Sequence, residues 1–444
     1  MATRNGGAFV LVALCVSGLA LRVAGAGEPL MPAMYVLGDS TVDVGNNNLL
    51  PGCSPDCRAN YQRYGVDFPT HKPTGRFSNG YNLADQIAGG GWVKEEEEVV
   101  VVVVVVVMEV VVVEEVVEEE EVVVEEEKLV VEEEEVVAGG GGRRRRWSPE
   151  EEEKVVVAGV AQFLGFTESP PAYGSLPPER ILGQMKTGIN FASGGSGLQD
   201  QTGKHCGRVY TMTDQLEEFT SAVQMMGNSS YDLISRSLVF ISVGSNDLFE
   251  YVDGNATLSP SRNDTAFLEG LVGTYKCYLQ ELYAVGARKF SIVSPSMVGC
   301  CPTQRYAGAT KKDLDGYRCF GTANDLSRQL YTKLHSMLQD LSVDLAGMNY
   351  SICDSAAMAE SVLKHAASPT LNLTVLDTGC CGGAGLSGDG KCTKFASVCP
   401  NRDNYLFWDG FHPTQAASAE AAFALVADQG LYVHPINITR LAAL

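Results

Sequence analysis

Residues 33–40 read Ala33-Met34-Tyr35-Val36-Leu37-Gly38-Asp39-Ser40, an apolar run that stops at a glycine and two polar residues. The five apolar residues predict a short buried strand. The turn predicted after it places Ser40 at the carboxyl edge of a sheet. Ligands of open α/β sheets bind at that edge, so Ser40 is a candidate nucleophile, although Gly-Asp-Ser is also a common turn without any chemistry.

Four more apolar runs predict strands of the same sheet, at residues 188–193, 238–243, 289–293 and 349–353. Segments that favour helix separate or follow these runs, at residues 267–285, 323–345 and 415–427. Strands that alternate with helices indicate right-handed crossovers and a parallel sheet. The sequence therefore predicts an α/β fold.

Two of the predicted strands end in glycine-rich polar turns, Gly194-Gly195-Ser196-Gly197 and Gly244-Ser245-Asn246-Asp247. Ester hydrolysis develops an oxyanion that needs hydrogen-bond donors already in place. The candidates are the backbone N–H of Gly195, the side-chain amide of Asn246 and the N–H of Ser40. Each has an ordinary alternative, Gly195 as a bare turn and Asn246 as a helix cap. The residues also leave open whether Gly194 or Gly195 is the donor.

A second polar turn near the end of the chain reads Trp408-Asp409-Gly410-Phe411-His412-Pro413. A catalytic serine needs a base, and the base needs a carboxylate that fixes its tautomer. The spacing of three residues allows Asp409 to accept from Nδ1 of His412 within one turn. Taken alone, Asp-x-x-His is equally compatible with a metal pair or with a capped helix start.

Residues 1–26 have the pattern of a secretory leader, with Arg4, an apolar core over 8–21 and the cleavage pattern Ala24-Gly25-Ala26. The apolar core is short for a membrane span.

Removal of the leader leaves 12 of the 13 cysteines. An even, dense set in a secreted chain predicts disulfides. The alternative is a zinc site formed by Cys380, Cys381, Cys392 and Cys399. Six sequons are candidate glycosylation sites: Asn228, Asn255, Asn263, Asn349, Asn372 and Asn437.

The segment over residues 88–160 interrupts this pattern with runs of Val, Glu, Gly and Arg. Its 22 Glu against 3 Lys and 4 Arg contribute −15 of the chain's net charge of −21, so that charge does not indicate an acidic binding surface. The one basic run, over residues 143–146, lies there too, so nothing indicates nucleic-acid binding. We interpret the segment as disordered or as an artefact of the gene model, such as an unspliced intron, rather than as a real acidic insertion. If Ile87 is joined to Ala161, four apolar residues fall on one predicted helical face.

Together these motifs resemble the plant GDSL esterase/lipases of the SGNH hydrolase superfamily. The resemblance rests on Gly38-Asp39-Ser40, Asp43-Val44-Gly45-Asn46-Asn47-Asn48, Asn190-Phe191-Ala192-Ser193-Gly194-Gly195, Gly244-Ser245-Asn246-Asp247 and Trp408-Asp409-Gly410-Phe411-His412-Pro413. It implies a three-layer α/β/α, flavodoxin-like fold with a parallel five-stranded sheet. It also implies Ser40 as nucleophile, His412 as base, Asp409 as its partner, and Ser40, Gly195 and Asn246 as oxyanion donors. Thr41 stands where the resemblance leads us to expect a bulkier apolar residue.

Two classes of function follow from this pattern. The first is a secreted esterase or lipase that acts on lipids, acetylated glycans or polyesters, in the cell wall or apoplast. The second is a catalytically weak secreted glycoprotein with a carbohydrate-binding or structural role. For either, we expect a single domain over residues 27–444 interrupted at 88–160, a monomer, no cofactor, no metal and no membrane span.

Overall fold

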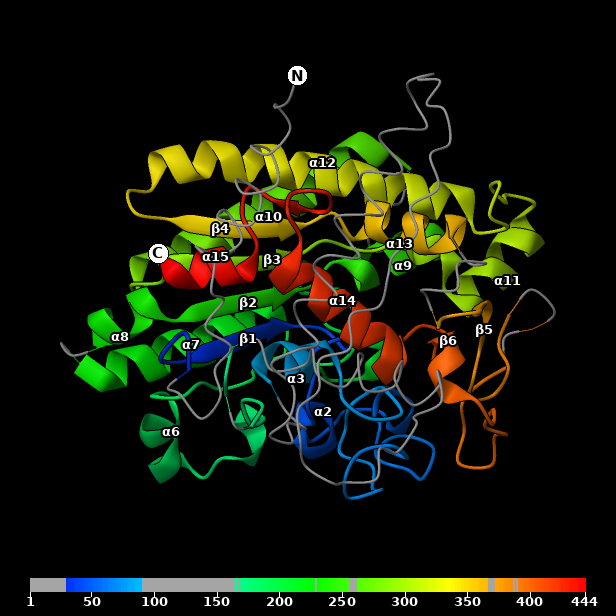
Figure 1. Ribbon diagram of the computed structural model, residues 1–444, viewed down its shortest axis with the longest axis horizontal. Helices are drawn as coiled ribbons and strands as arrows, with labels where there is room; N and C mark the ends of the chain where they lie inside the picture. The colour runs from blue at the N-terminus through cyan, green and yellow to red at the C-terminus, as the bar shows by residue number, and fades with distance from the viewer. Residues whose placement is uncertain are drawn as a thin grey trace, which may run out of the picture. The chain divides into compact units, whose positions relative to one another are not determined.

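Five strands form the central sheet, in the order β1 (Met34–Gly38), β2 (Leu238–Ser242), β3 (Lys289–Val293), β4 (Asn349–Cys353) and β7 (Val433–His434) (Figure 1). The first four are parallel, and β7 pairs antiparallel with β4. Every residue of β1 and β2 is buried. Such near-continuous apolar strands are typical of a sheet covered on both faces. The predicted α/β class is confirmed.

The computed structural model describes residues 29–89, 164–166, 168–227, 230–254, 262–365, 372–385, 388 and 390–444. These residues belong to one compact unit, Ala26–Gly91 with Ala161–Leu444. The predicted leader and almost all of the segment 88–160 lie outside the described residues, as do Asn228 and Asn255. No described helix is long and apolar enough to cross a membrane.

The prediction of a fifth parallel strand at residues 188–193 is wrong. Asn190 forms only isolated parallel bridges, one to Val36 of β1 and one to Ala172. The segment runs beside β1, since Phe191 N donates to Val36 O at 2.8 Å. Asn190, however, directs its side chain to the serine loop that follows β1, where Nδ2 donates to Val42 O, and the ladder does not extend. The fifth strand is instead the short antiparallel β7.

Helices pack against both faces of the sheet. Tyr35 and Leu37 of β1 and Val239 of β2 belong to a core that includes residues of α7 (Met212–Met226), α10 (Asp264–Ala284) and α12 (Gly321–Asp344). The alternate residues Met34 and Val36 belong to a second core, with α3 (Leu83–Ala88), α14 (Gln415–Ala427) and α15 (Ile438–Ala443). This alternation is what a strand period of two produces.

The remaining elements are shorter and surround the sheet. The helices are α2 (Asn46–Leu49), α6 (Pro178–Gln184), α8 (Ser230–Arg236), α9 (Ser245–Asp253), α11 (Pro302–Lys311) and α13 (Ser355–Lys364). The strands β5 (Val375–Gly379) and β6 (Tyr405–Phe407) form a separate parallel pair.

The two described ends of the interruption meet. Helix α3 ends at Ala88, and Gly89 follows in the left-handed conformation. Phe166 N donates to Ala88 O at 3.0 Å. Leu164 and Phe166 are buried in the same core as Ile87, but residues 164–166 are not helical. The chain on either side therefore shares one core, without forming in this chain the continuous helix expected for a joined sequence.

Eight of the twelve cysteines after residue 26 form disulfides: Cys57–Cys206, Cys300–Cys319, Cys380–Cys399 and Cys381–Cys392. Cys53, Cys277, Cys301 and Cys353 are free. The disulfide interpretation is thus confirmed for these eight, and the zinc alternative is wrong because its four sulfurs are bonded to one another. Among the sequons, Asn437 is buried, and its amide donates to Asp428 O.

Candidate active site

The Ser40 turn is fixed by Gly38 at the end of β1. Gly38 has φ 145°, and a Cβ there would lie 2.0 Å from Ser242 O of the neighbouring strand. The side chain of Gln215 on α7 binds both backbone groups of Gly38, accepting from N at 2.8 Å and donating to O at 2.9 Å. Only glycine permits this close approach, so the strand ends and the chain turns at Ser40.

The second turn holds Asp409 and His412 just after β6. Asp409 Oδ1 accepts from the backbone N–H groups of Phe411 and His412, each at 2.9 Å. Nδ1 of His412 lies 2.8 Å from Asp409 Oδ2, and Nε2 lies 2.8 Å from Ser40 Oγ. A carboxylate can only accept, so Nδ1 carries the proton and Nε2 accepts from Ser40. The three predicted residues thus form one continuous hydrogen-bonded chain.

The hydrogen-bonded series from Ser40 through His412 to Asp409 is largely shielded from water. Ser40 and Asp409 are buried, and the ring of Phe77 lies against the imidazole of His412 with centroids 4.8 Å apart. Burial alone raises the pKa of Asp409, but the charge and hydrogen bond of His412 and the two backbone amides lower the pKa below its usual value. Asp409 is therefore ionised at neutral pH and can hold an imidazolium.

The backbone N–H groups of Gly194 and Gly195 differ in their hydrogen bonding. Gly194 N already donates to Asp43 Oδ2 at 3.0 Å. The N–H groups of Gly195 and Ser40 have no hydrogen-bond acceptor among the described residues. Asn246 on α9 donates one amide hydrogen to Ser196 O at 2.8 Å, and this leaves the other hydrogen of its NH₂ group available.

Asp43 connects the serine loop to the Gly194 turn, a role that sequence reasoning missed although its motif was noticed. Besides Gly194 N, its carboxylate accepts from the backbone of Gly45 at 2.7 Å and of Asn46 at 2.8 Å. Burial raises the pKa of Asp43 to about 6, while these amides lower it. Asn47 Nδ2 adds a bond to Gly194 O at 2.8 Å. The nucleophile and the candidate oxyanion turn are therefore held by one polar network.

Thr41, which replaces the expected apolar residue, forms hydrogen bonds with two side chains. Its hydroxyl donates its one hydrogen to Asp39 Oδ1 at 2.8 Å and therefore accepts from Ser242 Oγ at 2.9 Å. It therefore ties the serine turn to the end of β2, a bond that an apolar residue at this position cannot form.

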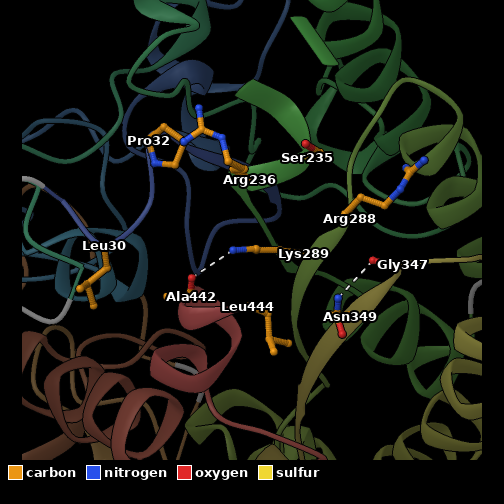
Figure 2. A pocket seen from close by; sticks show the side chains of 10 residues that line it. All are labelled: Leu30, Pro32, Ser235, Arg236, Arg288, Lys289, Gly347, Asn349, Ala442 and Leu444. Carbon is orange, nitrogen blue, oxygen red and sulfur yellow. Dashed lines mark hydrogen bonds between the residues drawn. The ribbon is translucent and has the colours of Figure 1, made fainter. Parts of the chain in front are cut away.

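Neither a metal cluster nor the hollow in Figure 2 coincides with this site. The one cluster of metal-binding side-chain types within the described ranges is Cys57, His205 and Cys206, and its two sulfurs form a disulfide. The hollow, of about 450 Å³, is lined by Lys289 and Asn349, the first residues of β3 and β4. It therefore lies at the amino edge of the strands, opposite the Ser40 edge. In Figure 2, Lys289 Nζ donates a hydrogen bond to the carbonyl of Ala442, and the guanidinium groups of Arg236 and Arg288 point away from Lys289.

Comparison with known proteins gives consistent similarities. The family model described as GDSL-like Lipase/Acylhydrolase matches residues 137–425, a range that includes Gly195, Asn246, Asp409 and His412 and begins after Ser40. GDSL esterase/lipase At1g71691 of Arabidopsis thaliana is 29% identical over 94% of this chain and 87% of its own length. GDSL esterase/lipase At1g33811 of the same plant is 28% identical over 93% and 92%, and GDSL esterase/lipase At1g29660 is 27% identical over 98% of each chain.

Proposed function

Since the chain belongs to the GDSL-like lipase and acylhydrolase family, whose relatives are named esterases and lipases, and is accordingly a hydrolase of ester bonds, we propose that Ser40, His412 and Asp409 carry out this hydrolysis. The observation that supports the proposal best is the unbroken chain from Ser40 Oγ through His412 to Asp409, with both terminal contacts at 2.8 Å. Nucleophile, base and carboxylate stand in the order that acyl transfer needs.

In the proposed reaction, Nε2 of His412 takes the hydroxyl proton while Ser40 Oγ attacks the ester carbonyl carbon. The tetrahedral oxyanion is held by the N–H groups of Ser40 and Gly195 and by the amide of Asn246. The C–O bond of the ester then breaks, and the alcohol leaves with the proton from His412. Water, deprotonated by His412, attacks the acyl-serine, and the acid is released as the proton returns to Ser40.

We further propose a monomeric enzyme with three-layer, flavodoxin-like architecture that acts outside the cell. Helices on both faces of the sheet support the layering. The leader-like pattern of residues 1–26 and the four disulfides support secretion, because disulfides persist in oxidising compartments.

An apolar pair beside the site favours esters with an apolar chain over acetylated glycans. Phe249 follows Asn246 by three residues on α9, and its ring meets that of Phe411 edge-on at 5.2 Å. Phe411 is 39% exposed, and its ring centroid lies 6.4 Å from that of His412. Phe411→Ala should lower kcat/KM for long-chain p-nitrophenyl esters more than for the acetate. Phe395→Ala, at an exposed ring on another segment, is the control.

The nucleophile is tested by Ser40→Ala. The variant should be secreted and folded like the wild type, and its kcat should fall by roughly 10⁴- to 10⁶-fold, as for other triads that lose one member. Ser342→Ala, at a half-buried serine of α12 whose hydroxyl donates to Gln339 O of the same helix, should keep full activity. Ser40→Ala retaining a tenth of the wild-type kcat would show that Ser40 is not the nucleophile. A wild type that hydrolyses no ester in the series would favour the catalytically weak glycoprotein.

A further inference from the structure

The Asp409 carboxylate receives a hydrogen bond from far outside its own turn. Its Oδ1 accepts from two backbone amides within residues 409–412, and its Oδ2 accepts from His412 Nδ1. Oδ2 also accepts from the phenol of Tyr64 at 2.8 Å, across 345 positions of sequence. Among the described residues, Tyr64 is the one donor to this carboxylate that the turn does not itself supply.

Tyr64 is held firmly enough to orient its partner. It is buried in a cluster with Phe77 and with Trp408, the residue before Asp409. Its ring meets the ring of Tyr61 edge-on at 5.1 Å and that of Phe77 at 6.0 Å, and Phe77 in turn lies against His412. One aromatic group therefore touches both the base and its carboxylate, and Tyr64 is its hydrogen-bonding member.

The tyrosine can act only as a donor in this setting. Burial raises the pKa of Tyr64 well above its ordinary value, and the negative charge of Asp409 raises it further. The phenol thus keeps its proton at neutral pH, and the ionised carboxylate of Asp409 can only accept from it. It points the positive end of its O–H dipole at the same oxygen that His412 uses.

We propose that Tyr64 is a positioning residue for the hydrolysis, which holds Oδ2 of Asp409 in line with Nδ1 of His412 while the imidazole gains and loses its proton. The inference rests on the proposed function. The phenol of Tyr64 donates to Asp409 rather than to Ser40 or His412, so it acts through Asp409. Without the phenol, the two backbone amides still hold Oδ1, but His412 Nδ1 is the one donor left to Oδ2. Because Nδ1 also lies 2.9 Å from Oδ1, a small tilt of the carboxylate then moves the hydrogen bond of the imidazole from Oδ2 towards Oδ1.

The variant Tyr64→Phe removes the hydroxyl and keeps the ring in its cluster. Loss of a hydrogen bond to a charged group should lower kcat roughly tenfold, with KM within about twofold. The acid limb of the kcat/KM profile should move up by about half a pH unit, because the O–H dipole no longer opposes the charge of the imidazolium. The other ionisable groups around the pair, Asp39 facing His412 and Tyr61 and Cys301 facing Asp409, are unchanged in this variant.

Tyr61→Phe is the control for the packing of this loop, since the side chain of Tyr61 contacts Tyr64 but its hydroxyl donates to Cys392 O rather than to Asp409. It should leave both kcat and the acid limb unaltered. Equal losses in the two variants with an unmoved acid limb would show that the loop acts only by its packing, and would overturn the assignment. Tyr64→Phe with wild-type kcat and profile would overturn it as well.

A double-mutant cycle with Asp409→Asn gives a second measurement that does not depend on the pH profile. If Tyr64 acts through Asp409, Tyr64→Phe should change the residual kcat of Asp409→Asn by less than about twofold. A full tenfold effect in that background would place the role of Tyr64 elsewhere. The proposed function fails separately, through Ser40→Ala that stays active or a wild type without esterase activity.

Discussion

Removal of residues 88–160, with Ile87 joined directly to Ala161, should stabilise the described fold and preserve esterase activity. In the full chain, α3 ends at Ala88, and Phe166 N donates to the carbonyl of that residue at 3.0 Å. The segment thus leaves and re-enters the fold at one point. After the joining, Ala161 takes the position of Ala88, so the residue type that Phe166 meets is the same.

The expected gain comes from the shorter connection. The fold closes a loop over the 78 positions from Ala88 to Phe166, and the joined chain closes one over the 5 positions from Ala161 to Phe166. With loop entropy growing as the logarithm of length, this shortening raises the free energy of unfolding by about 2 kcal/mol. The net charge also falls from −21 to −6, which reduces self-repulsion in the folded state.

The assay is urea denaturation of the two secreted proteins, followed by tryptophan fluorescence, with p-nitrophenyl ester hydrolysis measured in parallel. A third chain, in which Gly/Ser residues of equal number replace residues 90–160, keeps the long connection but lacks its charge. Any difference between this chain and the full chain therefore measures the charge effect, and the joined chain should unfold at a higher midpoint than either. The reasoning is refuted if the joined chain is less stable than the full chain, or if it is secreted but inactive. Either result would make the segment a structural element.

Three further predictions concern the oxyanion donors, the cysteines and the buried carboxyls. Asn246→Ala should lower kcat by roughly 10²- to 10³-fold with little change in KM; a raised KM with normal kcat would mark Asn246 as a ground-state contact. Thiol titration of denatured, unreduced mature protein should find the four free cysteines, and native protein should react at the exposed Cys277 alone; eight or more thiols in denaturant would contradict the pairing. The pKa values of Asp39, Asp43 and Asp247 are raised by burial to about 6. An unfolded aspartate has a pKa of roughly 3.9. The folded chain therefore binds more protons than the unfolded chain between about pH 4 and 6, so the free energy of unfolding should be larger at pH 5 than at pH 7, and equal denaturation midpoints at the two values would argue against it.

Sequence pattern predicts the elements whose burial is continuous and misses those that depend on distant partners. The apolar runs at 289–293 and 349–353 coincide with β3 and β4, and the helix predicted at 415–427 coincides with α14. Strand β7 has only two residues, Val433 and His434, too few to produce a periodicity. The run at 188–193 has the composition of a strand, but nothing local shows that Asn190 turns its side chain back to Val42.

The residues of the candidate site likewise differ in whether the local sequence is enough to identify them. Asp409 and His412 lie three residues apart, and Ser40 follows an apolar run, so local spacing is enough to propose them. Tyr64 lies in a polar loop with no motif of its own, and its contact with Asp409 exists only in the folded chain. The hydrogen bond from Gly194 N to the distant Asp43, which favours Gly195 as the proposed donor, likewise has no signal in the local sequence.

The separation of Ser40 from His412 by 372 positions also bears on when the protein can first act. Ribosomes add roughly 5 to 20 residues per second, so His412 is made some 20 to 75 seconds after Ser40. Throughout that interval the nascent chain holds a serine turn with no base to activate it. The antiparallel strand β7 and the helices α14 and α15 are made in the same final stretch. Completion of the sheet and assembly of the proposed triad thus coincide, so the proposed chemistry becomes available only when the domain is nearly complete.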